Sequence, residues 1–260
     1  NLVAYMESHD EQRVAHDALN FGNSAGTYDV QDHATAMDRL GMAHAFLLAL
    51  PGPKMMYQWG EFGYDVSLYD CLNGTFAEGC KLDEKPEPWA DLALDPDRQA
   101  LARAVKGVCD LKRNEPVFST YDYNIDFGGS GKRLHLYSPG QNVVLCGNFD
   151  VVGFDMVPGF PHTGVWTDAL SGDTHEVTDL SASFYFAPGQ HHLWMDTPVT
   201  PLAEDAPLAL SSSTCEDDLA LNFGGAAPCT YTVTVSLDAT DLEDAGLVYA
   251  LGLHVAGSFQ

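Results

Sequence analysis

The stretch "NLVAYMESHDEQR" (residues 1–13) joins an apolar run directly to a dense group of charged residues. Unbroken apolar runs that end abruptly in polar residues are typical of strands buried on both faces of a parallel sheet. Residues 54–61, "KMMYQWGE", repeat this pattern and also end in a glycine and an acid. We therefore expect two buried strands with polar residues at their carboxyl ends.

Helical patterns follow each of these predicted strands. Apolar residues recur at three- and four-residue steps over residues 32–50, where Asp32 is the predicted N-cap. A second helix is predicted to begin after Asp95, with Pro96 in its first turn, and to end before Pro116. The order strand, helix, strand, helix predicts an α/β region with a parallel sheet over residues 1–116.

The sequence pattern changes near residue 117. Short alternating runs separated by turn residues predict an antiparallel β-sandwich over residues 117–197. The runs are "VFSTYDYNIDF", "RLHLYS", "NVVLCGNFDV", "GVWTDAL", "THEVT", "SFYFA" and "HHLWM". Prolines and a serine triplet predict a linker over residues 198–230, and residues 231–260 alternate like the first strands of another β module.

The charge balance limits the partners. The 260 residues include 37 acids against 12 lysines and arginines, which gives a formal net charge of −25. Such a surface repels nucleic acids and anionic membranes but not a neutral substrate. No apolar stretch approaches the roughly 18 residues that a membrane span needs. Composition does not predict the oligomeric state.

Six cysteines indicate an oxidising environment. Cys71 and Cys80 flank a turn-rich loop, and Cys215 and Cys229 bracket a second loop-like stretch, so we expect two local disulfides. None of the cysteines forms the paired C-x-x-C spacing of a zinc site. A secreted or cell-surface protein is therefore expected.

The charged strand end has two other interpretations. Ser8 or Asp10 could cap a short helix through "EQRVAHDAL" while Glu7 pairs with Arg13. The second interpretation is a metal site with four ligands. These residues lack the H-E-x-x-H spacing, so we predict no metal site here. Those ligands would be His9, Asp10, His16 and Asp17.

Two motifs resemble the α-amylase family (glycoside hydrolase family 13). "YMESHDEQR" is similar to the family's fourth conserved region, and "LPGPKMMYQWGEFG" is similar to its later strand motif. The resemblance extends through "KPEPW" and the predicted sandwich and covers about residues 2–197. It implies the last two βα units of a (β/α)8 TIM barrel, a C-terminal β-sandwich domain and the start of an immunoglobulin-like module, truncated at both ends.

The resemblance also implies roles for individual residues. Asp10 matches the third catalytic carboxylate, which grips sugar hydroxyls in the −1 subsite and favours the oxocarbenium-like ring. His9 matches the histidine that hydrogen-bonds the same sugar. Tyr57 and Glu61 match the later motif and are expected to line or brace the pocket. The remaining charged pair, Glu7 and Arg13, is expected to brace the strand end.

The resemblance is incomplete in one important respect. Retaining glycosidases need a nucleophile and an acid/base about 5 Å apart, and neither family motif for these carboxylates occurs here. The expected function is therefore part of a retaining α-glucan hydrolase, inactive by itself. An α-glucan transferase and a non-catalytic glucan-binding relative are the alternatives. Calcium is common in the family, but its usual ligands lie upstream, so no site is assigned; the terminal module could bind starch or act as a spacer.

Overall fold

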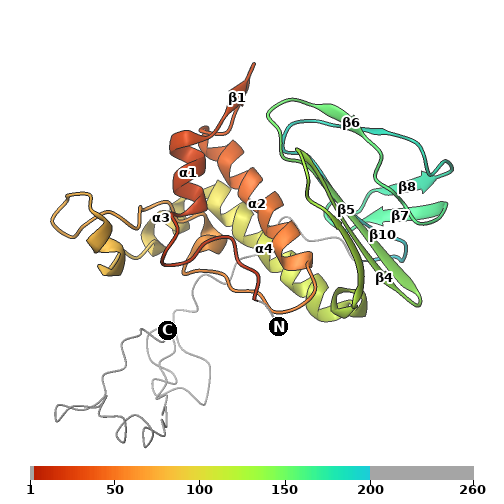
Figure 1. Ribbon diagram of the computed structural model, residues 1–260, viewed down its shortest axis with the longest axis horizontal. Helices are drawn as coiled ribbons and strands as arrows, with labels where there is room; N and C mark the ends of the chain where they lie inside the picture. Colours follow the sequence, from red (N-terminus) through yellow and green to blue (C-terminus); the bar gives the residue numbers. More distant parts are fainter. Residues whose placement is uncertain (1–2, 200–260) are drawn as a thin grey trace, which may run out of the picture. The chain divides into compact units, whose positions relative to one another are not determined.

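The computed structural model describes residues 3–199, which lie within one compact unit of the chain (Figure 1). The predicted module at 231–260, the predicted pair Cys215 and Cys229, and all but the first two residues of the predicted linker at 198–230 lie outside the described residues. The described part combines a helical region with antiparallel β-sheets.

The two predicted helices are confirmed together with their caps. α2 (His33–Ala49) begins after Asp32, whose carboxylate accepts the Thr35 N–H at 3.0 Å. α4 (Pro96–Asn114) begins after Asp95, whose carboxylate accepts two N–H groups in the first turn. Two shorter helices are also present: α1 (Val14–Phe21), which overlaps the short helix of the alternative interpretation through "EQRVAHDAL", and α3 (Trp89–Leu94), which was not predicted.

The helices form one layer of the structure. α2 and α4 lie side by side, as Figure 1 shows, and α1 packs against them through a shared apolar cluster. That cluster includes Met37, Leu40, Leu101, Val105 and Val108. No helix within residues 3–199 is long and apolar enough to cross a membrane.

Antiparallel strands form the second part. The six-stranded sheet has the order β3-β4-β5-β10-β7-β8, and β6 pairs with β9 in a separate two-stranded sheet. The six strands are β3 (Asp122–Asp126), β4 (Gly131–Ser138), β5 (Gln141–Asn148), β10 (His191–Met195), β7 (Gly164–Asp168) and β8 (Thr174–Val177). The short pair is β6 (Phe154–Met156) and β9 (Phe184–Phe186). Each predicted alternating run contributes a strand, and β6 is an additional one.

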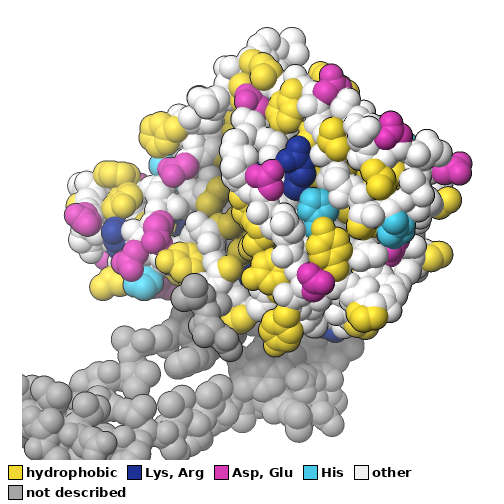
Figure 2. Space-filling model, turned by 45° about the vertical axis from the view of Figure 1, so that its right-hand side comes forward, with side chains coloured by type: hydrophobic (Ala, Val, Ile, Leu, Met, Phe, Trp, Pro, Cys, Tyr) yellow, Lys and Arg dark blue, Asp and Glu magenta, His cyan; other side chains and the backbone are white. Residues whose placement is uncertain are grey.

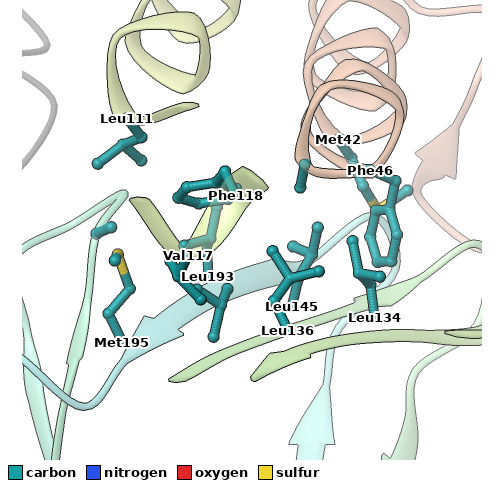
Figure 3. Close-up of a cluster of buried hydrophobic side chains, with 13 residues drawn as sticks. Met42, Phe46, Leu111, Val117, Phe118, Leu134, Leu136, Leu145, Leu193 and Met195 are labelled. Carbon is teal, nitrogen blue, oxygen red and sulfur yellow. The ribbon is translucent and has the colours of Figure 1, made fainter. Parts of the chain in front are cut away.

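The central strands of the six-stranded sheet, β4, β5 and β10, place buried apolar side chains on both faces, because successive side chains in a strand alternate between the two sides. One face packs on α2, α4 and the 3₁₀ turn Pro116–Ser119 (Figure 3). Figure 3 shows Phe46 and Phe118 above Leu134, Leu136 and Leu145 of the strands. The other face packs Val144, Trp166 and Trp194 against Met156 and Phe186 of the short sheet. The six-stranded sheet therefore packs on the helices with one face and on the β6–β9 sheet with the other.

The prediction of two fully buried N-terminal strands is wrong for the described residues. The two segments touch through a single parallel bridge, Ala4 with Lys54. Val3 and Tyr5 are about half exposed, at 51% and 49%. A strand becomes fully buried only when neighbours cover its edges and faces, and among residues 3–199 each segment has only the other as a bridge partner. A small hairpin, β1 (Ser24–Ala25) with β2 (Tyr28–Asp29), was not predicted.

Buried histidines make the stability of the fold dependent on pH. Burial lowers the pKa of His191 from 6.5 to about 4, and burial also lowers the pKa values of His44 and His135. Between pH 4 and pH 6.5 these histidines are therefore protonated in the unfolded state but not in the folded state. The free energy of unfolding has its full value above pH 6.5 and falls as the pH drops toward 4. We expect His191 to account for a loss of up to about 2.4 kcal/mol in urea unfolding between pH 7 and pH 4.5. His191→Gln should reduce this slope, and an unchanged slope would contradict the assignment.

Candidate functional site

The candidate site lies where the two N-terminal segments end. The Ala4 N–H donates to the Pro53 carbonyl at 3.2 Å, and the Met55 N–H donates to the Ala4 carbonyl at 3.0 Å. The segments run parallel, so residues 7–10 and residues 57–61 follow them at the same end. This is the arrangement in which strand ends of an α/β sheet gather functional side chains.

A buried ion pair forms the base of the site. Arg13 is fully buried, Glu7 is 6% exposed, and Arg13 Nη1 lies 3.5 Å from Glu7 Oε1. The same nitrogen donates to the Gln58 carbonyl at 2.5 Å. Because Arg13 contacts both polypeptide segments, the pair fixes the turn at residues 7–10 against the loop at residues 57–61.

Glu7 also starts the following helix. Its Oε2 accepts the N–H of Val14, the first residue of α1, at 2.9 Å. The interpretation in which Ser8 or Asp10 caps this helix is therefore wrong. The cap comes from the buried Glu7, which leaves the Asp10 side chain without a capping role.

Two acidic side chains at the base of the site, Glu7 and Glu61, have raised pKa values. Burial raises the pKa of Glu7, while the Val14 N–H and the Arg13 guanidinium oppose that rise. Burial also raises the pKa of Glu61, with a further contribution from the charge of Glu7. Glu7 and Glu61 therefore both lie within the electrostatic influence of Arg13, in a poorly solvated environment.

Two tyrosines enclose the arginine. The Arg13 guanidinium lies 4.3 Å from the centre of the Tyr57 ring and 5.0 Å from that of Tyr64. Such cation–π contacts stabilise a cation that water cannot reach. The predicted residue Tyr57 thus packs against the arginine at the base of the site. Two atoms of that arginine, Arg13 Nε and Nη2, have no hydrogen-bond partner within residues 3–199.

His9 and Asp10 follow Glu7 in the same turn and face solvent. Their side chains are 63% and 69% exposed, and His9 Nε2 lies 3.4 Å from Asp10 Oδ2. The backbone of the turn is fixed, because the Asp10 N–H donates to Ser8 Oγ at 3.1 Å and Lys81 Nζ donates to the Asp10 carbonyl at 3.0 Å. The backbone position is set, while the His9 and Asp10 side chains contact each other and remain exposed to solvent.

A small cavity of about 10 Å³ is lined in part by Glu7, His44, Tyr57 and Gly60. This cavity is too small for a sugar ring, whereas the Asp10 side chain is exposed to solvent on the open side of the turn.

Sequence reasoning missed several supporting residues. Gln12 donates to Ser67 Oγ at 2.6 Å and accepts the Leu68 N–H at 3.1 Å. Trp59 adopts a left-handed backbone conformation with φ 65°, which costs a non-glycine residue about 1–3 kcal/mol and is common near functional sites. Gly60 has no room for a Cβ, which would collide with the Glu7 carboxylate. The glycines in "WGEFG" are the sequence signal for this tight turn, whereas nothing in the sequence indicates the role of Gln12.

The predicted disulfide between Cys71 and Cys80 is present. It closes the loop that leads to Lys81, the residue bonded to the Asp10 carbonyl. The disulfide therefore restrains a segment that contacts the candidate site.

Removing this disulfide should lower stability. A crosslink that closes a loop of about ten residues is expected to contribute about 2–3 kcal/mol by restricting the unfolded chain. The Cys71→Ser/Cys80→Ser variant should show this loss in urea unfolding. Cys109→Ser, which removes a free thiol, is the control and should change stability by less than about 1 kcal/mol. Equal losses in both variants would argue against a crosslink effect.

Two groups within residues 3–199 have metal-ligating atoms close together. Cys71, Cys80 and Asp83 form one, but both sulfurs are in the disulfide. His33, Asp95 and Asp97 form the other, and there Asp95 already pairs with His33 at 2.8 Å and with Arg98 at 3.1 Å. The disulfide occupies both sulfurs of the first group, and ion pairs occupy His33 Nε2 and Asp95 Oδ2 in the second.

No family model and no curated protein sequence matches the chain. Solved structures do match. AmyP in complex with maltose has a TM-score of 0.54 at 17% identity, over 75% of this chain and 40% of that one. The α-amylase from Geobacillus thermoleovorans complexed with acarbose has a TM-score of 0.52 at 13% identity, over 75% and 38%. Trehalose-6-phosphate hydrolase from Bacillus licheniformis has a TM-score of 0.53 at 14% identity, over 74% and 42%.

The chain thus spans between 38% and 42% of the length of these matched structures. At such identities the likeness concerns the fold. The described part of the chain has the fold of a portion of α-amylase-family enzymes, which confirms the resemblance predicted from the two motifs.

Proposed function

We propose that this chain is the C-terminal portion of a retaining α-glucan hydrolase of the α-amylase family. It supplies the transition-state-stabilising Asp10 and the substrate-binding His9 of the −1 subsite. One observation carries the proposal: the His9 and Asp10 side chains are exposed in the turn that begins at the buried Glu7–Arg13 pair, on the fold that α-amylase-family enzymes share.

The proposed chemistry follows from the geometry of these groups. The Asp10 carboxylate accepts hydrogen bonds from two sugar hydroxyls, and these bonds strengthen as the ring flattens and gains positive charge. His9 holds the same ring by a further hydrogen bond. The nucleophile and the acid/base come from residues outside this sequence, because neither motif occurs in it.

The exposed apolar side chains of the two N-terminal segments support the proposal of a larger barrel. Met55 and Met56 are 37% and 40% exposed, and Val3 and Tyr5 are more so. Additional parallel strands would cover them and complete the ladder that the Ala4–Lys54 bridge begins. We therefore propose that residues 1–116 are the last two βα units of a (β/α)8 barrel and that residues 117–197 are the C-terminal domain.

The proposed location is extracytoplasmic, as a secreted or cell-surface protein. The Cys71–Cys80 disulfide supports it, because such crosslinks persist in oxidising compartments. Calcium remains a proposal for the full-length enzyme, without assigned ligands.

Product analysis on maltoheptaose tests the proposed activity in the full-length enzyme. Shorter maltooligosaccharides released with the α-anomeric configuration, followed by NMR, are the expected result. Longer oligosaccharides would identify a transferase instead. Binding without turnover would identify a non-catalytic glucan-binding protein and would contradict the proposal.

A further inference from the structure

One lysine connects the turn at residues 7–10 to the loop that the disulfide closes. Lys81 lies 71 residues after Asp10 in the chain, and its Nζ donates to the Asp10 carbonyl at 3.0 Å. Within residues 3–199, the other hydrogen bond of the backbone at residues 8–11 is local, from the Asp10 N–H to Ser8 Oγ. The Lys81 bond is therefore the hydrogen bond that fixes this backbone to a distant part of the described chain.

The position of Lys81 is itself fixed by the loop. Its side chain is 20% exposed, and its ammonium lies 5.3 Å from the centre of the Tyr69 ring. The preceding residue, Cys80, is crosslinked to Cys71. Lys85 Nζ also donates to three carbonyls of the same loop, those of Leu68, Asp70 and Cys80. Because the loop is already ordered, the bond from Lys81 to the turn costs little further conformational entropy.

The alternative role of Lys81 is a surface ion pair. Its Nζ lies 3.7 Å from Glu78 Oε1, but the Glu78 side chain is 86% exposed, and pairs with so exposed an acid contribute little. Lysines and arginines number 12 against 37 acids, and the face in Figure 2 shows few of them among its hydrophobic and acidic side chains. Although carboxylates are abundant, the hydrogen bond of Lys81 goes to a neutral carbonyl. This choice of partner indicates a role in fixing the turn.

The rate of a reaction is sensitive to the position of a catalytic carboxylate, and a displacement of about 1 Å costs about 10²-fold. The Asp10 side chain is 69% exposed, so its place depends on the backbone from which it extends. We propose that Lys81 is a positioning residue for Asp10: it fixes the Asp10 carbonyl, and the loop closed by Cys71 and Cys80 fixes Lys81. The part of this role that concerns catalysis rests on the proposed function.

Lys81→Met in the full-length enzyme tests the role. Methionine keeps most of the aliphatic stem but removes the ammonium donor. The kcat on maltoheptaose should fall about tenfold while KM stays within about twofold, because a displaced carboxylate loses more in the transition state than in the ground state. Lys81→Arg retains a cationic donor and should restore kcat to within about threefold of the unchanged enzyme.

The matched control is Lys132→Met. The Lys132 ammonium also donates to backbone carbonyls, those of Phe127 and Gly129, and also lies 5.3 Å from an aromatic ring, that of Phe149. None of these partners belongs to the candidate site, so kcat should stay within about twofold of the unchanged enzyme. Circular dichroism checks that all variants are folded. Equal kcat values in the two methionine variants, or a loss that Lys81→Arg does not reduce, would overturn the positioning role.

Amide exchange supplies a measurement that does not depend on catalysis. In the 260-residue chain, Lys81→Met should speed exchange of the Asp10 N–H, followed by NMR, about tenfold and leave the amides of β5 unchanged. Cys71→Ser/Cys80→Ser should speed the same amide. Combined with Lys81→Met it should add less than about twofold, because both changes act through one bond. Unchanged Asp10 exchange in Lys81→Met would overturn the proposal.

The positioning role and the proposed function can fail separately. If Asp10→Asn abolishes turnover while Lys81→Met changes neither kcat nor the Asp10 exchange rate, the positioning role is refuted and the proposed function stands. If Lys81→Met speeds the Asp10 exchange while Asp10→Asn leaves turnover intact, Lys81 fixes the turn but the proposed function is refuted.

Discussion

Asp10→Asn should lower kcat on maltoheptaose by about 10³-fold in the full-length enzyme. The amide keeps the size of the side chain but loses its negative charge, which is the feature that favours the oxocarbenium-like transition state over the ground state. The Asp10 side chain is 69% exposed and is not involved in the buried base of the site, so the substitution should leave stability within about 0.5 kcal/mol. Initial rates with maltoheptaose and urea unfolding of the same preparation measure both effects.

The matched control is Asp17→Asn. Asp17 is an exposed acid in the first turn of α1, seven residues further along the chain, and its substitution removes the same charge. The kcat of the Asp17→Asn variant on maltoheptaose should stay within about twofold of that of the unchanged enzyme. Comparable losses in the two variants would indicate a general charge effect, and near-normal turnover with Asp10→Asn would reject its catalytic assignment.

Arg13→Met should destabilise the chain by about 3–5 kcal/mol at neutral pH. Arg13 is fully buried, and its removal leaves the buried Glu7 carboxylate without its positive partner. It also removes the cation between the Tyr57 and Tyr64 rings and the bond to the Gln58 carbonyl. Urea unfolding monitored by tryptophan fluorescence measures the loss.

The pH dependence and a double variant separate charge from packing. The folded-state pKa of Glu7 is already raised by burial, and losing Arg13 raises it further. A carboxyl group whose pKa is raised in the folded state lowers the stability of the fold at pH values above its unfolded pKa. The stability recovers when the pH falls through the folded pKa and the group becomes protonated. The deficit of Arg13→Met should therefore shrink at acid pH, relative to the unchanged chain at the same pH. Glu7→Gln/Arg13→Met should recover part of the loss at pH 7, and a deficit equal at all pH values would assign the effect to packing alone.

Local features of the fold could be predicted from the sequence. The bounds of α2 and α4 follow from apolar periodicity and from the caps Asp32 and Asp95, which act within their own first turns. The strands of the sandwich follow from alternation between turns. β6 was not among the predicted strands, although β9, its equally short partner, was.

Features that depend on distant neighbours could not be predicted. The apolar run before Glu7 has the composition of a buried strand, yet its burial depends on strands beside it that residues 3–199 do not provide. The capping of α1 by Glu7 acts across seven residues and requires the turn to be known first. The motif around Asp10 identified the candidate residues, whereas the buried position of Arg13 between two tyrosines emerged only from the structure.

The most direct test of the central claim is a crystal structure of the full-length enzyme with maltotriose bound. The proposed function predicts one sugar ring on the open side of the turn, with Asp10 carboxylate oxygens and a His9 ring nitrogen within hydrogen-bond distance, about 2.5–3.2 Å, of its hydroxyls. A sugar held between the catalytic nucleophile and acid/base without contact to Asp10 or His9 would contradict the assignment.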